Sequence, residues 1–168
     1  MIAEMAARGT PFVGLLYAGL ALTKNGLKVI EFNARFGDPE TQVLIPRLET
    51  PLATLLYNAA TDNLDDTVLN WRDESAVTVV VASDGYPESP KTGGEISLPS
   101  AVDASIYHAG TALSDGRLLS SGGRVLTVTG LGASLAIARE KAYAAISKIA
   151  LDKSFYRSDI ALKASEGK

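Results

Sequence analysis

Two apolar segments joined by one tight turn constrain the first part of the chain more than any other feature. The runs TPFVGLLYAGLALT and LKVIEFN flank Lys24, Asn25 and Gly26. Asn-Gly between two apolar runs is the strongest short-range signal for a β-hairpin. Because the first run is apolar on both faces, we expect this hairpin to be covered on one side and to line a site on the other.

Polar and charged side chains crowd the end of the second apolar run. The sequence VIEFNARFGDPETQ places Glu31, Asn33, Arg35, Asp38 and Glu40 close together. Alternate side chains of a strand share a face, so Glu31 and Asn33 point the same way, about 6.6 Å apart. A carboxylate and an amide oxygen at this spacing can bind a hard cation such as Mg²⁺, while water and phosphates complete its shell.

The residues after this pair favour an anion. Arg35 keeps the same parity if the chain stays extended, and its planar guanidinium suits phosphate or carboxylate. Gly37 permits a turn, and Asp38-Pro39-Glu40 is typical of a helix start, where the helix N-terminus attracts anions. Metal ligands, an anion clamp and a helix N-terminus in this order form a layout for phosphoryl transfer. The alternative is structural: an exposed strand end followed by a capped helix.

A polar segment at residues 63–75 is the expected linker between two domains. Residues 1–62 contain the hairpin and three helical segments, which are residues 2–8, a helix that starts at Asp38 and a helix that begins near Pro51. In residues 76–168, short apolar runs separated by Gly-rich turns predict several strands. A last helix, capped by Ser134, is expected to follow them because apolar residues recur there at helical spacing.

Composition excludes several classes of protein. The 168 residues include no cysteine and one histidine, His108, which excludes disulfides, thiolate zinc sites and two-His metal sites. The net charge is −3 and no long basic run occurs, so nucleic-acid binding is not expected. No apolar run approaches the roughly 18 residues of a membrane span, and the N-terminus lacks a signal-peptide pattern. We therefore expect a cytoplasmic protein with no membrane contact.

The stretch EFNARFGDPETQ resembles the signature of the phosphoribosylamine–glycine ligases, or glycinamide ribonucleotide synthetases, of the ATP-grasp superfamily. RFGDPE is its most specific part. The segments GTPFVGLLYAGL, GYPESPKTGGEI, HAGT, GGRVLTVTGLG, AYAAI and YRSDIA resemble other blocks of this family. The resemblance implies an α+β fold. In it, the end of an ATP-grasp antiparallel sheet with helices precedes a small β-rich barrel or sandwich that one helix covers.

The same resemblance implies a function in purine biosynthesis. The family joins glycine to phosphoribosylamine through a glycyl phosphate, using ATP and Mg²⁺ or Mn²⁺. By family analogy, Glu31 and Asn33 match the metal ligands and Arg35 matches the catalytic arginine beside the phosphates. Asp38 and Glu40 fall in the segment that faces the substrate.

Arg124 is a further candidate by the same analogy. The block GGRV lies toward the active site in the family, so Arg124 is expected to help bind nucleotide or phosphate. The alternative is that Gly122-Gly123 forms only a hairpin turn.

Family members are much longer than this chain. We therefore expect a C-terminal fragment whose partner is the remaining N-terminal domains of the same enzyme, and we expect the fragment to be inactive alone. Without those domains, residues 12–22 should expose an apolar face that drives self-association.

Two other readings stay open. Another ATP-grasp carboxylate–amine ligase would share the fold and the metal chemistry, but it would carry a signature other than RFGDPE. A non-catalytic β-rich interaction module would retain only the scaffold.

Overall fold

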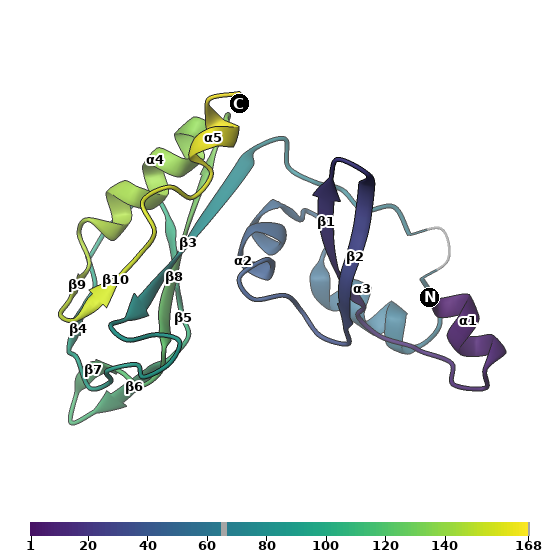
Figure 1. Ribbon diagram of the computed structural model, residues 1–168, viewed down its shortest axis with the longest axis horizontal. Helices are drawn as coiled ribbons and strands as arrows, with labels where there is room; N and C mark the ends of the chain where they lie inside the picture. Colours follow the sequence, from purple (N-terminus) through teal and green to yellow (C-terminus); the bar gives the residue numbers. More distant parts are fainter. Residues whose placement is uncertain (65–66, 168) are drawn as a thin grey trace. The chain divides into compact units, whose positions relative to one another are not determined.

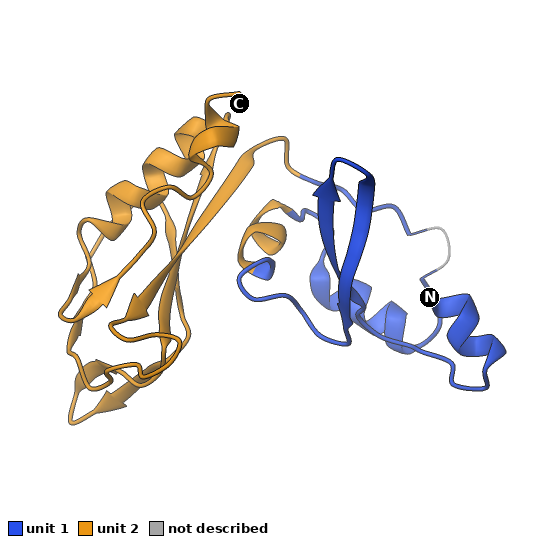
Figure 2. Ribbon diagram, viewed as in Figure 1, with its two compact units in different colours: residues 1–41, 48–71 blue, residues 42–47, 72–168 orange. Residues whose placement is uncertain are grey.

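Figure 1 shows the computed structural model, which describes residues 1–64 and 67–167. The chain divides into two compact units, drawn in different colours in Figure 2. Unit 1 comprises residues 1–41 and 48–71, and unit 2 comprises residues 42–47 and 72–168. The division into domains 1–62 and 76–168 with a linker between them stays a prediction.

Unit 1 is built around the expected hairpin. Its helices and strands are α1 (Ile2–Ala7), β1 (Tyr17–Thr23), β2 (Gly26–Asn33) and α3 (Leu52–Ala60). At the turn, the Thr23 hydroxyl accepts a hydrogen bond from the Asn25 N–H at 3.1 Å and donates one to the Gly26 carbonyl at 2.8 Å. Gly26 has a φ of 84°, which favours glycine, so the Asn-Gly signal predicted this turn correctly.

The hairpin contains a shift in register between Gly19 and Leu20. Leu20 pairs with Val29, but the next pair along is Gly19 with Glu31. A bulge of this kind places two residues of one strand opposite one residue of the other. Beyond it, Tyr17 pairs with Asn33.

The apolar side chains of the hairpin are largely exposed. Leu22 on β1 is 87% exposed and Ile30 on β2 is 70% exposed. Exposure of Val13, Leu20 and Leu22 confirms the predicted apolar face near residues 12–22. The exposed surface also extends along β2, where the large exposed side chains are Leu27, Val29, Ile30 and Phe32.

The helix expected to begin at Asp38 begins later. Asp38 and Pro39 are joined by a cis peptide bond, and the residues from Asp38 to Glu40 form a turn. Helix α2 (Thr41–Leu44) follows, and the 3₁₀ helix η1 (Ile45–Arg47) continues from it. The prediction of Asp38 as an N-cap was therefore wrong, and a four-residue helix gives no support to the expected anion site at its N-terminus.

Unit 2 contains a four-stranded antiparallel sheet in the order β10-β3-β8-β5. These strands are β3 (Ser75–Ser83), β5 (Ser105–His108), β8 (Arg124–Gly132) and β10 (Ser154–Phe155). Two small two-stranded sheets accompany it: β4 (Ile96–Ser97) with β9 (Ala150–Leu151), and β6 (Thr111–Ser114) with β7 (Arg117–Ser120). The remaining helices are α4 (Leu135–Ile146) and α5 (Leu162–Ser165).

The four-stranded sheet is open, so within the described residues this β-rich part is not a closed barrel, which was one of the two forms expected for it. Only β3 and β8 are long, with nine residues each. The edge strand β10 has two residues and β5 has four, so their short ladders do not close the sheet. The expected covering helix is confirmed: α4 lies along one face of the sheet (Figure 1).

The core of unit 2 lies between α4 and the two long strands. Alternate valines of β3 pack with Leu126 and Val128 of β8 and with the buried alanines of α4. Gly130 permits this close approach, because a Cβ there would lie 2.2 Å from the Ala138 carbonyl oxygen. Ser134 caps the helix as predicted, since its side chain accepts a hydrogen bond from the Ile137 N–H.

The described helices are short. None of them, within residues 1–64 and 67–167, is long and apolar enough to cross a membrane.

Candidate functional site

The candidate site in unit 1 begins with two side chains at the end of β2. Glu31 and Asn33 share a face of the strand, as their alternate positions predict. The side-chain nitrogen of Asn33 donates a hydrogen bond to Glu31 Oε1 at 3.0 Å. This contact uses the amide nitrogen. The Asn33 amide oxygen and the Glu31 carboxylate therefore lie side by side as possible oxygen ligands for a metal ion.

This pair fits a cation that takes few ligands from the protein. Among the described residues, no group of three or more His, Cys, Asp and Glu side chains could hold a metal ion. A site with one carboxylate and one amide oxygen suits Mg²⁺, which keeps several waters and binds substrate phosphates. It does not suit Ca²⁺, which takes six to eight oxygen ligands, or a structural zinc ion with four protein ligands.

The loop after β2 folds back against β1. A Cβ on Gly37 would lie 2.5 Å from Glu40 Oε2 and 2.9 Å from Tyr17 Cε2. Gly37 is buried, and its lack of a side chain lets the Glu40 carboxylate approach the Tyr17 ring. Glu40 is thereby held on the part of the hairpin where Tyr17 pairs with Asn33.

The pKa of the Tyr17 hydroxyl reflects burial and the approach of Glu40. Its pKa is raised above the ordinary value, first by burial and then by the negative charge of Glu40 and a hydrogen bond with that side chain. The charge of Glu31 raises this pKa further, whereas the charge of Arg35 lowers it. Three of the predicted site residues therefore act on one phenol. We infer that Glu31, Arg35 and Glu40 form one cluster around Tyr17.

Arg35 and Asp38 lie in the loop between β2 and α2. Strand β2 ends at Asn33, so the parity expected for an extended Arg35 does not apply. The Arg35 guanidinium donates a hydrogen bond from NH1 to the Phe36 carbonyl at 2.9 Å and is exposed. Asp38 is also exposed, in the turn before α2.

Arg124 belongs to unit 2, whereas the other candidates belong to unit 1. It is the first residue of β8 and pairs with Ala82 of β3. Its carbonyl accepts a hydrogen bond from the Gly110 N–H at 2.8 Å, and a Cβ on Gly110 would lie 2.7 Å from the same oxygen. The role of Arg124 in binding nucleotide or phosphate stays a prediction.

Tyr17 is the member of this cluster that the sequence did not reveal, and Gly37 was predicted only as a turn residue. Counting pairs back from the turn without a bulge would place Phe32 opposite Tyr17. The register shift places Asn33 there instead. The signal available in the sequence was a tyrosine within a long apolar run, which by itself indicates only packing.

Comparisons with known proteins match both parts of the chain. Residues 76–163 match the family described as phosphoribosylglycinamide synthetase, C domain. Residues 1–41 match the ATP-grasp (A) domain of the same synthetase. The hairpin and the candidate cluster therefore fall within the ATP-grasp match, while the sheet of unit 2, apart from Ser75, falls within the C-domain match.

Relatives of known name are about half identical to this chain. The phosphoribosylamine–glycine ligase of Streptomyces coelicolor is 57% identical over 169 residues, which cover 96% of this chain and 41% of that protein. The ligase of Corynebacterium ammoniagenes is 53% identical over 167 residues, which cover 98% of this chain and 39% of that protein. The chain thus spans about two-fifths of the length of these relatives.

Solved structures have the same fold. A crystal structure of phosphoribosylamine–glycine ligase from Thermotoga maritima matches 95% of this chain and 40% of its own, with a TM-score of 0.85 and 35% identity. The biotin carboxylase domain of 2-oxoglutarate carboxylase from Hydrogenobacter thermophilus, solved with MgADP and bicarbonate, covers 99% of this chain and 39% of its own. Its TM-score is 0.66 at 15% identity, which shows a shared fold alone.

Proposed function

The chain belongs to the phosphoribosylglycinamide synthetase family, and from this premise we propose that it is the C-terminal part of a phosphoribosylamine–glycine ligase. In the proposed reaction, ATP phosphorylates the glycine carboxylate, and the amine of phosphoribosylamine attacks the resulting acyl phosphate. The observation that carries the proposal is the Glu31–Asn33 contact, because it sets two oxygen donors side by side within the ATP-grasp match.

We assign the metal and phosphate end of the site to β2 and the loop after it. Glu31 and Asn33 would hold Mg²⁺, or Mn²⁺ in its place, through their side-chain oxygens. A divalent cation bound there would offset negative charge on the transferred phosphate. Arg35 is the proposed catalytic cation beside the acyl phosphate, since its planar guanidinium can bind phosphate oxygens in pairs.

Substrate contacts are assigned to the same loop. Glu40 would face the substrate in an orientation held by Tyr17, and Asp38 would contact substrate from the exposed turn. Arg124 would bind nucleotide or phosphate from unit 2. Tyr17 and Gly37 would act as positioning residues, because they set the place of Glu40 and need not touch the reacting atoms.

The exposed hairpin supports the proposal that the remaining N-terminal domains of the same enzyme are the partner of this chain. A two-stranded hairpin is at best marginally stable alone, and more strands or a covering helix are needed for stability. The large exposed apolar side chains of β1 and β2 supply the surface for such a cover. We also propose that the enzyme acts in the cytoplasm, where purine biosynthesis would take place.

Reconstitution would test this function. The 168-residue chain is mixed with the N-terminal portion of a matching ligase, phosphoribosylamine, glycine, ATP and Mg²⁺, and ADP release is followed. We expect activity only when both portions are present. Glu31→Ala and Asn33→Ala should each abolish it, while Lys28→Ala, an exposed change on the same strand, should not. Association of the portions without ADP release, or full activity of both site variants, would refute the proposal.

A further inference from the structure

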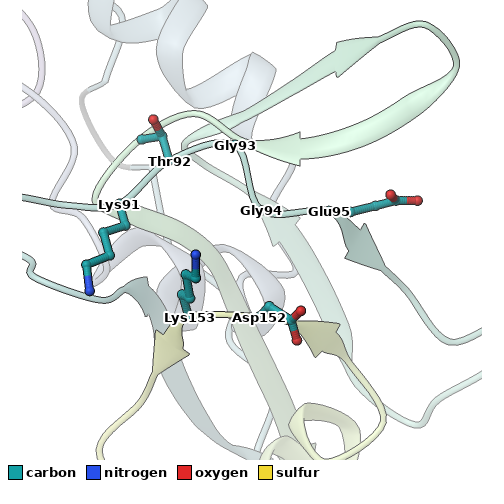
Figure 3. Close-up of a pocket in the computed structure, with 7 residues that line it drawn as sticks. All are labelled: Lys91, Thr92, Gly93, Gly94, Glu95, Asp152 and Lys153. Carbon is teal, nitrogen blue, oxygen red and sulfur yellow. The ribbon is translucent and has the colours of Figure 1, made fainter.

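A pocket in unit 2 is lined by none of the residues assigned above. Figure 3 shows its seven lining residues, which come from the segment 91–95 and from the turn at Asp152 and Lys153. Its volume is about 290 Å³. The pocket therefore has room for a small polar molecule.

The end of β3 fixes the backbone of both pocket lysines. The Lys91 N–H donates a hydrogen bond to the Asp84 carbonyl at 2.9 Å. The Asp84 N–H donates to the Lys153 carbonyl at 2.8 Å. One residue thus joins two segments that are distant in sequence and holds the two lysines beside each other.

The part of the wall formed by Gly93 and Gly94 is fixed by Ser120 at the end of β7. The Gly93 N–H donates to the Ser120 carbonyl at 2.7 Å, and the Gly94 N–H donates to the Ser120 hydroxyl at 3.0 Å. A Cβ on Gly94 would lie 3.2 Å from the Asp152 carbonyl oxygen. Because Gly94 has no side chain, the two segments approach closely and define the pocket by backbone contacts.

Charge is separated within the pocket. In Figure 3, the Lys91 and Lys153 side chains extend on one side, while the Glu95 and Asp152 carboxylates extend on the other, away from the lysines. Glu95 lies 4.0 Å from the Arg117 guanidinium. In the part of the chain that the structure describes, neither pocket lysine forms an ion pair with a carboxylate. Among the described residues, the lysine end of the pocket therefore presents two ammonium groups that no carboxylate approaches to ion-pair distance.

We propose that Lys91 and Lys153 bind the phosphate group of a phosphate monoester. A lysine ammonium is a compact positive charge with three hydrogen-bond donors. Two such side chains together balance the dianionic charge of a phosphate ester near neutral pH. The carboxylates at the other end would accept hydrogen bonds from hydroxyl groups of the same molecule. This combination fits a sugar phosphate better than a simple anion. The identity of that sugar phosphate as the phosphoribosyl substrate rests on the proposed function.

Titration of the isotope-labelled 168-residue chain with ribose 5-phosphate, inorganic phosphate and ribose tests the site without requiring ligase activity. Amide chemical shifts of the segment 91–95 and of Lys153 report binding. We expect saturable shifts with both phosphates and none with ribose. Lys91→Ala and Lys153→Ala should each weaken binding about tenfold, because each removes a charge-assisted hydrogen bond. Lys148→Ala, which removes an exposed lysine outside the pocket, should leave binding unchanged.

The two sources of phosphate give different results. Tighter binding of ribose 5-phosphate than of inorganic phosphate would support a sugar-phosphate ligand. Equal binding would support the phosphate site and assign it to free phosphate. The proposal is overturned if neither phosphate gives saturable shifts, or if Lys148→Ala weakens binding as much as the pocket variants while all spectra retain the folded pattern. These binding results can be interpreted even if the ligase reconstitution gives no activity. Failure of the phosphate site can therefore be distinguished from failure of the proposed function.

Discussion

Single residues of the candidate cluster are held by one contact along β2 and by the approach of the following loop to β1. The Glu31–Asn33 contact follows from the alternation of side chains along one strand, so it could be predicted from the sequence. The position of Glu40 could not, because it depends on the approach of a loop to Tyr17 on another strand. Local spacing fixes the first contact, and tertiary packing fixes the second.

Tyr17→Phe tests the proposed positioning of Glu40. The change keeps the ring that lies beside Gly37 and removes the hydroxyl whose pKa is raised by burial and by Glu40. In the reconstituted ligase, we expect the KM of glycine or of phosphoribosylamine to rise about fivefold with little change in stability, as for loss of one hydrogen bond. Steady-state kinetics measures this. Tyr57→Phe is the control, since Tyr57 is an exposed tyrosine of the same unit. Unchanged KM values for both substrates would contradict the positioning role.

Among the elements, α4 was predicted most fully from the sequence. Its buried residues recur at helical spacing, and Ser134 stands where an N-cap belongs. The helix after β2 was predicted least well, because the pattern Asp-Pro-Glu is also compatible with the turn that precedes Thr41. Apolar periodicity over several helical turns was therefore a more reliable signal for a helix than a short capping pattern.

Ser134→Ala should destabilise unit 2 through α4. The variant leaves the Ile137 N–H without its side-chain acceptor, which costs about 1 kcal/mol of unfolding free energy. Urea denaturation followed by circular dichroism measures the change. Ser147→Ala at the other end of α4 removes only an exposed hydrogen bond to the Ala144 carbonyl and should cost less. Equal stability of Ser134→Ala and the wild type would show that the cap contributes nothing.

The segment before α5 is fastened to α4 by Arg139 and Tyr143. The Arg139 Nε donates a hydrogen bond to the Ile160 carbonyl at 2.9 Å, and the Ile160 N–H donates to the Tyr143 hydroxyl at 3.2 Å. Within the same segment, Arg157 donates to both carboxylate oxygens of Asp159, at 3.0 and 2.8 Å. The hydrogen bond with Arg157 is the main reason why the pKa of Asp159 is lowered.

The Arg157–Asp159 pair predicts a pH dependence. Because its pKa is lowered by folding, Asp159 stabilises the folded chain above its ordinary pKa, and this contribution is lost as the pH falls through the lower folded value. Asp159→Asn should therefore have a slightly lower Tm than the wild type at pH 7, and the difference should shrink as the pH falls below the ordinary pKa of an aspartate. The effect is small because both side chains are exposed. Asp73→Asn, at another exposed aspartate, is the control. A Tm difference that does not shrink as the pH falls would contradict this assignment.

For the whole molecule, the two units differ in how much of their apolar surface is buried. The buried hydrophobic core lies in unit 2, between its sheet and α4, whereas large apolar side chains of the hairpin in unit 1 are exposed. Exposed apolar patches of this kind mark interaction surfaces. The proposed enzyme would cover this one with its N-terminal domains.

The isolated chain should therefore self-associate. Sedimentation equilibrium is expected to show a mass that rises with concentration, driven by the exposed hairpin. Leu22→Lys combined with Ile30→Lys should shift the chain toward monomer, because these side chains are 87% and 70% exposed. Leu113→Lys in unit 2 is the matched control at 76% exposure and should leave the association unchanged. A monomeric wild-type chain at high concentration would contradict the prediction.

The sequence by itself determined the hairpin turn, the shared face of Glu31 and Asn33, and the capped helix α4, because each depends on residues close together in the chain. The tertiary structure decided the hairpin register that sets Tyr17 opposite Asn33 and the open strand order β10-β3-β8-β5. The tertiary structure also decided that Lys91 and Lys153 line the same pocket. Each of these joins distant segments. Their pairing is selected by the packing and hydrogen bonding of the folded chain, which local patterns do not specify.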